Sequence, residues 1–241
     1  MIKLVASDLD GTLLHNYQQT VPKEIYDTIK ALHEKGIIFT AASGRQYANI
    51  RRLFAPLGFD IPYIAENGSM CVYKEEILAT GLTPSKTIRH ILDALMEYRK
   101  IYHTGHCILS VKDTYYSDST DERFIDYMEN DMHNIVTYVP DLYAIKEPII
   151  KAAICDFGGT KNLEPFFHKR IGDEIRVGVL FQVQVLGGDV QRVQVLALVL
   201  VHPLDLAVED GVGVDDLAGA LLQIGGKVLL IVQLDLVDAL Q

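Results

Sequence analysis

The sequence has no excess of basic residues and no long uninterrupted apolar segment. Its 241 residues carry a formal net charge of −10, which argues against a nucleic-acid-binding surface, because such a surface needs clustered basic residues. The longest apolar region, residues 193–208, is interrupted by Gln194, His202, Pro203 and Asp205. It falls short of the ~20 apolar residues that span a bilayer. We therefore expect neither a nucleic acid nor a membrane as a partner.

Cysteine is also scarce. Cys71, Cys107 and Cys155 are the three cysteines, and they lie far apart in the chain. An odd number at such spacing indicates reduced thiols rather than a disulfide framework or a zinc site. Near the N-terminus, Asp8 and Asp10 stand where the apolar core of a signal peptide would lie. We therefore expect a cytoplasmic protein. The negative net charge does not exclude anionic substrates, because a bound metal can dominate the field inside a site.

Two acidic residues follow a short apolar segment near the start of the chain. Residues 2–6 are mostly apolar and predict a strand that is buried on both faces. Asp8 and Asp10 come soon after it, and Gly11 permits a tight turn. In open α/β sheets, ligands bind at the carboxyl ends of the strands. Two carboxylates this close repel each other unless a cation lies between them or one is protonated. The pair therefore predicts a chemical site, with an ordinary acidic loop as the alternative.

A hydroxyl and a glycine follow the second predicted strand. A helix is expected over residues 22–36, and residues 37–42 form a second apolar segment. This strand–helix–strand order predicts a parallel pair with a right-handed crossover. Ser43 and Gly44 then offer a hydroxyl and an amide that can donate to a phosphate oxygen, although an ordinary turn is the alternative. Arg45 either approaches a substrate anion or forms a surface ion pair.

These motifs resemble those of the haloacid dehalogenase superfamily, in particular its Cof-type phosphatases. Residues 8–12, Asp-Leu-Asp-Gly-Thr, resemble the nucleophile motif of that superfamily. Residues 43–45, Ser-Gly-Arg, resemble its second motif, with serine in place of threonine. Residues 66–68, Glu-Asn-Gly, resemble a segment of Cof-type members, although Asn-Gly also predicts a plain hairpin turn. The resemblance covers about residues 1–170 and is strongest over 1–69.

The resemblance implies an α/β fold, with a Rossmann-like parallel-sheet core and an inserted α+β cap. The sequence itself changes pattern after residue 82, where helices and antiparallel strands follow in an order typical of a separate α+β unit. In Cof-type relatives, such a C2-type cap covers the active site and selects the substrate. We expect the N-terminal part of the core over 1–82, the cap over 83–185 and the C-terminal part of the core over 186–241. The elements expected in the cap are helices over 87–98 and 121–132 and strands over 107–111, 114–116 and 148–155.

For the chemistry, the resemblance implies hydrolysis of a phosphate monoester through an aspartyl-phosphate intermediate. Asp8 would be the nucleophile, since a carboxylate is already ionised near neutral pH. Asp10 would protonate the leaving alkoxide and later activate water. The phosphoryl oxygens would be bound by the backbone amides around Leu9, by the hydroxyl of Ser43 and by Gly44.

A Mg²⁺ site is implied at the same place. The ligands would be the Asp8 carboxylate, the Asp10 backbone carbonyl and an acid from a later strand, an oxygen-only set that suits this ion. Asp210, in the acidic segment 209–216, is the candidate for the later ligand. An acidic turn between two apolar segments is the alternative for that stretch. Arg45 would contact the substrate.

The last part of the chain differs in composition from the rest. Residues 171–241 contain no Ser, Thr, Asn, Tyr, Cys or Met, and Lys227 is their one lysine. Alternation over 177–186 and again over 190–201 predicts a hairpin. The lysine that the family uses to steady the nucleophile and phosphoryl charge is not found in its usual context. The stretch is therefore either a divergent sequence or a frame-shifted replacement of the family's C-terminal third.

Three functional hypotheses follow. The first is a Mg²⁺-dependent phosphatase for small phosphorylated metabolites such as sugar phosphates. The second is a catalytically impaired or non-enzymatic relative, because the C-terminal third lacks recognisable partners for the nucleophile motif. The third is phosphotransfer to an acceptor other than water. The sequence carries no signal for the oligomeric state or for the identity of one substrate.

Overall fold

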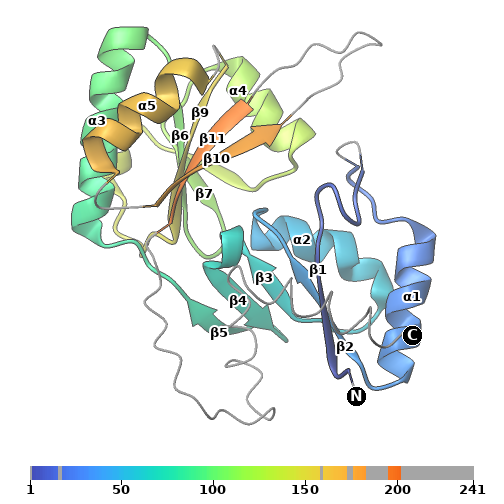
Figure 1. The fold of residues 1–241 in the computed structure, drawn as a ribbon. Coiled ribbons are helices and arrows are strands. Elements are labelled where there is room, and N and C mark those ends of the chain that lie inside the picture. Colours follow the sequence, from blue (N-terminus) through green and yellow to red (C-terminus); the bar gives the residue numbers. More distant parts are fainter. Residues whose placement is uncertain (1, 16–17, 158–159, 173–175, 183–194, 202–241) are drawn as a thin grey trace, which may run out of the picture. The chain divides into compact units, whose positions relative to one another are not determined.

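The computed structural model describes residues 2–15, 18–157, 160–172, 176–182 and 195–201. The described chain divides after Thr80 into two compact units. Each unit contains its own β-sheet (Figure 1). The expected α/β fold class is confirmed.

The first unit is built on a five-stranded sheet in which the strands follow one another in chain order. β1, β2 and β3 are parallel neighbours, whereas β3, β4 and β5 form an antiparallel meander. The predicted parallel pair is thereby confirmed, and so is the predicted hairpin at Asn67-Gly68, which joins β3 to β4. The strands are β1 (Leu4–Asp8), β2 (Ile38–Ala42), β3 (Tyr63–Ala65), β4 (Met70–Tyr73) and β5 (Glu76–Thr80).

Helices in the first unit bury one apolar side against this core. In α1, Ile29 is buried, and in α2 the buried apolar side chains are Ile50, Leu53 and Phe54. Their spacing of three or four residues places them on one face of the helix. The helical segments are α1 (Lys23–Glu34), α2 (Tyr47–Phe54) and the short 3₁₀ turns η1 (Ala55–Leu57) and η2 (Glu66–Gly68).

The second unit is built on a six-stranded sheet with the order β10-β11-β9-β6-β7-β8. All neighbours in it are antiparallel except β7 and β8. The predicted hairpins of β6 with β7 and of β10 with β11 are confirmed. The strands are β6 (His106–Ser110), β7 (Tyr115–Ser117), β8 (Val136–Tyr138), β9 (Lys151–Asp156), β10 (Arg176–Gln182) and β11 (Val195–Val201).

Helices cover both faces of the second sheet. One core cluster joins α3 and α5, which lie side by side in Figure 1, to Leu109 and Ile154 of the sheet. A second cluster packs Phe124 and Met128 against Cys155, the neighbour of Ile154. Consecutive strand residues thus point to opposite faces, as the pleat requires. The helical segments are α3 (Ser85–Tyr102), α4 (Glu122–Asp126), the π-helical turn η3 (Tyr127–Asp131), η4 (Leu142–Ala144) and α5 (Thr160–Ile171).

The division into units differs from the expected domain boundaries at one end. The expected boundary after residue 82 lies close to the observed division after Thr80. The expected boundary after residue 185 separates β10 from β11, but both strands belong to the second unit. The physical reason is the hydrogen-bond ladder, because β11 pairs with β9 as well as with β10.

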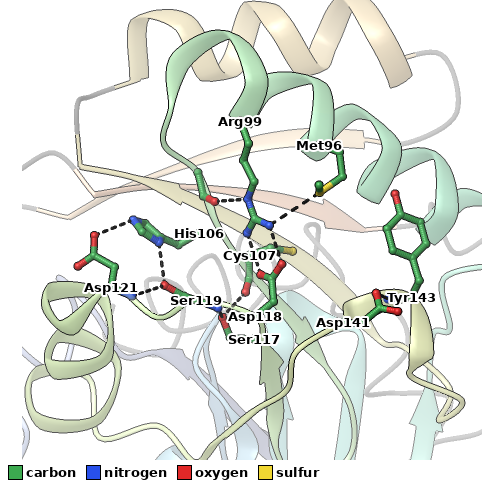
Figure 2. A network of polar contacts seen from close by, with 11 residues as sticks. Met96, Arg99, His106, Cys107, Ser117, Asp118, Ser119, Asp121, Asp141 and Tyr143 are labelled. Carbon is green, nitrogen blue, oxygen red and sulfur yellow. Dashed lines mark hydrogen bonds and ion pairs between the residues drawn. The ribbon is translucent and has the colours of Figure 1, made fainter.

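A forked ion pair connects three segments of the second unit. The guanidinium of Arg99 donates to the two carboxylate oxygens of Asp118 at 2.6 and 2.8 Å (Figure 2). Its Nε donates to the Gly105 carbonyl at 2.8 Å. The fork therefore ties the last turn of α3 to the loop before β6 and to the segment after β7.

Other expectations concern thiols and membranes. The three thiols are buried and unpaired, as predicted. Burial raises the pKa of the Cys71 thiol to about 11, which makes this thiol a poor nucleophile near neutral pH. Within the described ranges, no helix has both the length and the apolarity needed to cross a membrane.

Candidate active site

The loop after β1 is anchored by the buried residue Leu9. Leu9 is fully buried, and its carbonyl accepts hydrogen bonds from the amides of residues 12–14 at 3.2, 3.0 and 2.8 Å. Gly11 lies in this loop at φ +88°, a left-handed conformation that favours glycine. Because Leu9 is anchored inward, Asp8 and Asp10 flank it at the carboxyl end of the strand.

Asp8 is the last residue of β1, and its carboxylate is partly buried. Burial raises the pKa of Asp8 above its ordinary value, and the nearby charge of Asp10 acts in the same direction. Hydrogen bonds from the Leu9 amide and the Thr12 hydroxyl lower this pKa and offset part of the effect. The hydroxyl of Thr12 donates to Asp8 Oδ2 at 3.4 Å. The site therefore holds a carboxylate whose charge is only partly compensated by the chain.

The second motif lies beside the first because β1 and β2 are parallel neighbours in register, with Asp8 opposite Ala42. Ser43 follows β2 directly, and its amide donates to the Ile64 carbonyl at 2.8 Å. Its hydroxyl lies 3.5 Å from Asp10 Oδ2 and accepts a hydrogen bond from the Arg45 amide at 3.2 Å. The structure thus brings Asp10 and Ser43 to one sheet edge.

Arg45 binds Asp10 through a fork. Its Nε donates to Asp10 Oδ2 at 2.9 Å, and its Nη2 donates to Oδ1 at 2.6 Å. The Arg45 side chain is 5% exposed and that of Asp10 is 42% exposed. Nη1 of Arg45 donates to Gln19 at 3.0 Å and to Asn49 at 3.3 Å. An ion pair was one of the two expectations for Arg45, but the pair lies within the site, with the guanidinium buried, and not at the surface.

Gln19 and Asn49 were not identified from the sequence. Asn49 lies in α2, which begins at Tyr47, after Arg45, so the helical spacing of four residues does not apply to this pair and gave no signal. Gln19 lies in a polar loop, and nothing in its surroundings marks it. Only the structure shows that both side chains accept hydrogen bonds from the guanidinium of Arg45.

Residues 66–68, the segment that resembles Cof-type members, contact the turn at residues 43–45. The amide of Glu66 donates to the Arg45 carbonyl at 3.1 Å, and that of Asn67 donates to the Ser43 carbonyl at 3.3 Å. Glu66 and Asn67 adopt positive φ angles of 54° and 60°. The side chain of Asn67 lies so close to Gly44 that a Cβ at Gly44 would be 2.8 Å from Asn67 Nδ2.

The metal ligands expected from the sequence are only partly described. Asp8 and Asp10 provide hard oxygen donors at one sheet edge, and such donors suit Mg²⁺. Arg45 binds the carboxylate of Asp10, whereas the expected ligand atom is its backbone carbonyl. Asp210 lies outside the described residues, as does Lys227. Among the residues that the structure describes, no group of three His, Cys, Asp or Glu residues is arranged to hold a metal.

Comparison with known proteins places these motifs in a family context. Residues 5–179 match the model of a family described as haloacid dehalogenase-like hydrolase. Phosphoglycolate phosphatase 1 of Saccharolobus solfataricus is 39% identical over 77 residues, which are 32% of this chain and 34% of that protein. The 5-amino-6-(5-phospho-D-ribitylamino)uracil phosphatase of Escherichia coli is 27% identical over 95 residues, which are 39% of this chain and 35% of that protein.

A solved structure described as a subclass IIB sugar phosphatase of the same superfamily has a TM-score of 0.64 at 20% sequence identity. The similarity covers 83% of this chain and 70% of the other. At 20% identity, this similarity supports a shared fold and no more. The matches to the two curated relatives span about a third of their length, 34% and 35%.

Proposed function

This chain belongs to the haloacid dehalogenase-like hydrolase family, of the Cof type, and we propose that it is a Mg²⁺-dependent phosphatase acting through an aspartyl-phosphate. The observation that carries the proposal is the meeting of two motifs at one sheet edge. Asp8 ends β1, and Ser43, which directly follows β2, lies 3.5 Å from the carboxylate of Asp10. Phosphate-monoester hydrolysis needs this combination of a nucleophile, a proton donor and phosphate-binding groups.

The proposed substrates are small phosphorylated metabolites of the cytoplasm, such as sugar phosphates. The names of the relatives support this class, since they include a phosphoglycolate phosphatase and a sugar phosphatase. The donors near the two acids favour it as well. The hydroxyl of Ser43 suits a phosphoryl group, which offers several acceptor oxygens.

In the proposed first step, a carboxylate oxygen of Asp8 attacks phosphorus and the bond to the leaving oxygen breaks. Asp10 gives its proton to that oxygen, so the product leaves as an alcohol. In the second step, Asp10 takes a proton from water, and the hydroxide formed attacks the phosphorus. Inorganic phosphate leaves, and Asp8 is regenerated as a carboxylate. Ser43 and Gly44 hold the phosphoryl oxygens during both steps.

Arg45 holds Asp10 in place for this proton transfer. A bidentate fork fixes both the position and the plane of a carboxylate, so Asp10 stays beside the leaving-group side of the phosphate site.

The proposed ligands of the Mg²⁺ ion are the Asp8 carboxylate, the Asp10 backbone carbonyl and Asp210. When bound, the ion would offset the negative charges of the phosphoryl group and of Asp8, which otherwise repel each other. Burial raises the pKa of Asp8, and a cation beside this carboxylate would offset the cost of its charge.

A non-catalytic phosphate-binding protein is the second candidate. It is favoured by the composition of residues 171–241, which contain a single lysine, Lys227, outside the setting that the family uses. Losing one charge-stabilising group costs roughly 10²–10³ in rate, so a missing lysine would weaken catalysis without preventing phosphate binding.

The test is release of inorganic phosphate from a generic aryl phosphate and from a panel of sugar phosphates, with Mg²⁺ or with a chelator. We expect Mg²⁺-dependent release by the wild-type chain and none by Asp8→Asn. Equal release by the two proteins would exclude Asp8 as the nucleophile. Phosphate binding without hydrolysis of any substrate would support the non-catalytic candidate. Transfer that requires an added acceptor would indicate a phosphotransferase.

A further inference from the structure

The turn at residues 43–45 touches a second turn that the proposed mechanism does not use. Two amides of that second turn, from Glu66 and Asn67, donate to the carbonyls of Arg45 and Ser43 at 3.1 and 3.3 Å. The two residues that flank Gly44 thus accept hydrogen bonds from the second turn. The two turns therefore form one backbone unit at the edge of the sheet.

The side chain of Asn67 lies against the backbone of Gly44. Gly44 does not adopt a positive φ angle, so its backbone conformation is open to other residues. A Cβ at this position would instead lie 2.8 Å from Asn67 Nδ2 and 3.1 Å from Asn67 Oδ1. The carboxamide of Asn67 thus occupies the space in which a side chain at position 44 would begin.

Backbone strain in the second turn is a further sign of constraint. Glu66 and Asn67 are consecutive non-glycine residues with positive φ, a conformation that costs free energy and persists only where surrounding contacts enforce it. Lys74 and Glu75 show the same pair of angles in the same sheet. There, however, the two residues form the tight connection between β4 and β5, a turn that requires positive φ. The turn at Glu66 and Asn67 also connects two strands, β3 and β4. In addition, its amides donate to carbonyls of the turn at residues 43–45.

We propose that Asn67 is a positioning residue of the phosphate site, which shapes the turn at Ser43 and Gly44 through its side chain. This inference rests on the proposed function, since it takes that turn to bind the phosphoryl group. Asn67 is exposed, whereas its neighbour Glu66 is buried. Its carboxamide therefore lies at the open side of the turn, where it sets the position of the Gly44 backbone without being part of the core.

Inorganic phosphate in the presence of Mg²⁺ is the probe for a first experiment, measured by calorimetry on the full chain. Asn67→Gly removes the side chain and keeps the backbone angles accessible. We expect it to bind phosphate about three- to tenfold more weakly, the effect of one lost contact. Asn67→Asp keeps the shape and tolerates positive φ, but its charge repels the anion, so we expect a larger loss that shrinks at high salt.

Matched controls separate this role from general damage to the sheet. Lys74→Ala changes an exposed residue of the other left-handed turn, and it should leave phosphate affinity unchanged. Asn67→Gly binding phosphate as tightly as the wild type would overturn the proposal, because the turn would then keep its shape without the Asn67 side chain. Equal losses in Asn67→Gly and Lys74→Ala would also overturn it.

A double-mutant cycle tests the contact itself. Gly44→Ala should weaken phosphate binding, because the new methyl group displaces the Asn67 side chain. Gly44→Ala combined with Asn67→Gly should bind more tightly than Gly44→Ala alone, since the space is then available. Additive losses would overturn the proposal. Hydrolysis is scored separately: wild-type protein that binds phosphate and shows this coupling without turnover would refute the phosphatase and keep the inference, whereas wild-type protein that binds no phosphate would refute both.

Discussion

Two arginine forks, one in each unit, have nearly the same geometry and different surroundings. Arg45 binds both oxygens of Asp10 at 2.9 and 2.6 Å in the first unit. Arg99 binds both oxygens of Asp118 at 2.6 and 2.8 Å in the second. By distance alone, the two forks are indistinguishable.

The neighbours of the two carboxylates differ. Asp118 is 17% exposed, and its arginine also binds a backbone carbonyl, so the fork joins a helix end to two loops. Asp10 is 42% exposed and lies two residues from Asp8 and 3.5 Å from the Ser43 hydroxyl. A fork around a more exposed acid, next to a second acid and a hydroxyl, is suited to chemistry. A fork around a more buried acid that connects two loops to a helix, as at Asp118, is suited to stabilising the fold.

The largest expected effect is a loss of activity on replacing Asp10 that replacing Asp118 does not cause. Asp10→Asn should lower phosphatase activity by about 10²–10³, because it removes the proton donor. It should also cost about 1–3 kcal/mol of unfolding free energy, since a buried guanidinium loses its charged partner. Asp118→Asn should show a similar loss of stability with unchanged hydrolysis of an aryl phosphate. Urea titration and steady-state kinetics on both variants measure this, and a loss of activity in both would erase the distinction.

A smaller effect is expected when the charge is kept and the fork is lost. Lysine cannot form the two parallel hydrogen bonds of a guanidinium. Arg45→Lys should therefore lower kcat by about tenfold, as expected for a misplaced proton donor, and should change KM little. Arg99→Lys is the matched control and should leave kcat unaffected while lowering the urea midpoint. An Arg45→Lys enzyme with wild-type kcat would show that the fork has no positioning role.

The smallest expected effect concerns stability and pH at Asp8. The pKa of Asp8 is raised by burial, so the folded chain holds the proton more tightly than the unfolded chain does. Ionised Asp8 therefore costs stability above its folded pKa, and this cost disappears as the pH falls below the unfolded value of about 3.9.

In chelator-treated buffer, Asp8→Asn should thus be more stable than the wild type near neutral pH, and the difference should vanish in acid. Thermal unfolding at several pH values measures it. Adding Mg²⁺ should stabilise the wild type more than the variant, because ion binding to the folded state needs the carboxylate. A less stable Asp8→Asn protein at neutral pH would contradict the direction of the pKa shift.

Much of the fold could be predicted from local patterns. The parallel pair of β1 and β2 followed from two apolar segments around an amphipathic helix, and the hairpins followed from alternation and turn residues. The boundary after residue 185 was wrong because β11 belongs beside β9, and that pairing joins strands far apart in the chain. Alternation shows that a segment is a strand, but it does not show which strand it pairs with.

The sequence by itself determined the nucleophile motif, the order of strand, helix and strand, and the small polar turn that ends β2. These features depend on neighbouring residues, whose periodicity and turn chemistry are visible in the chain. Only the tertiary structure decided that Arg45 binds Asp10, 35 residues away, and that Asn67 fills the space beside Gly44. Such contacts depend on how the loops after β1 and β3 curl at one edge of the sheet. That geometry is set by packing across the sheet, so no local pattern encodes it.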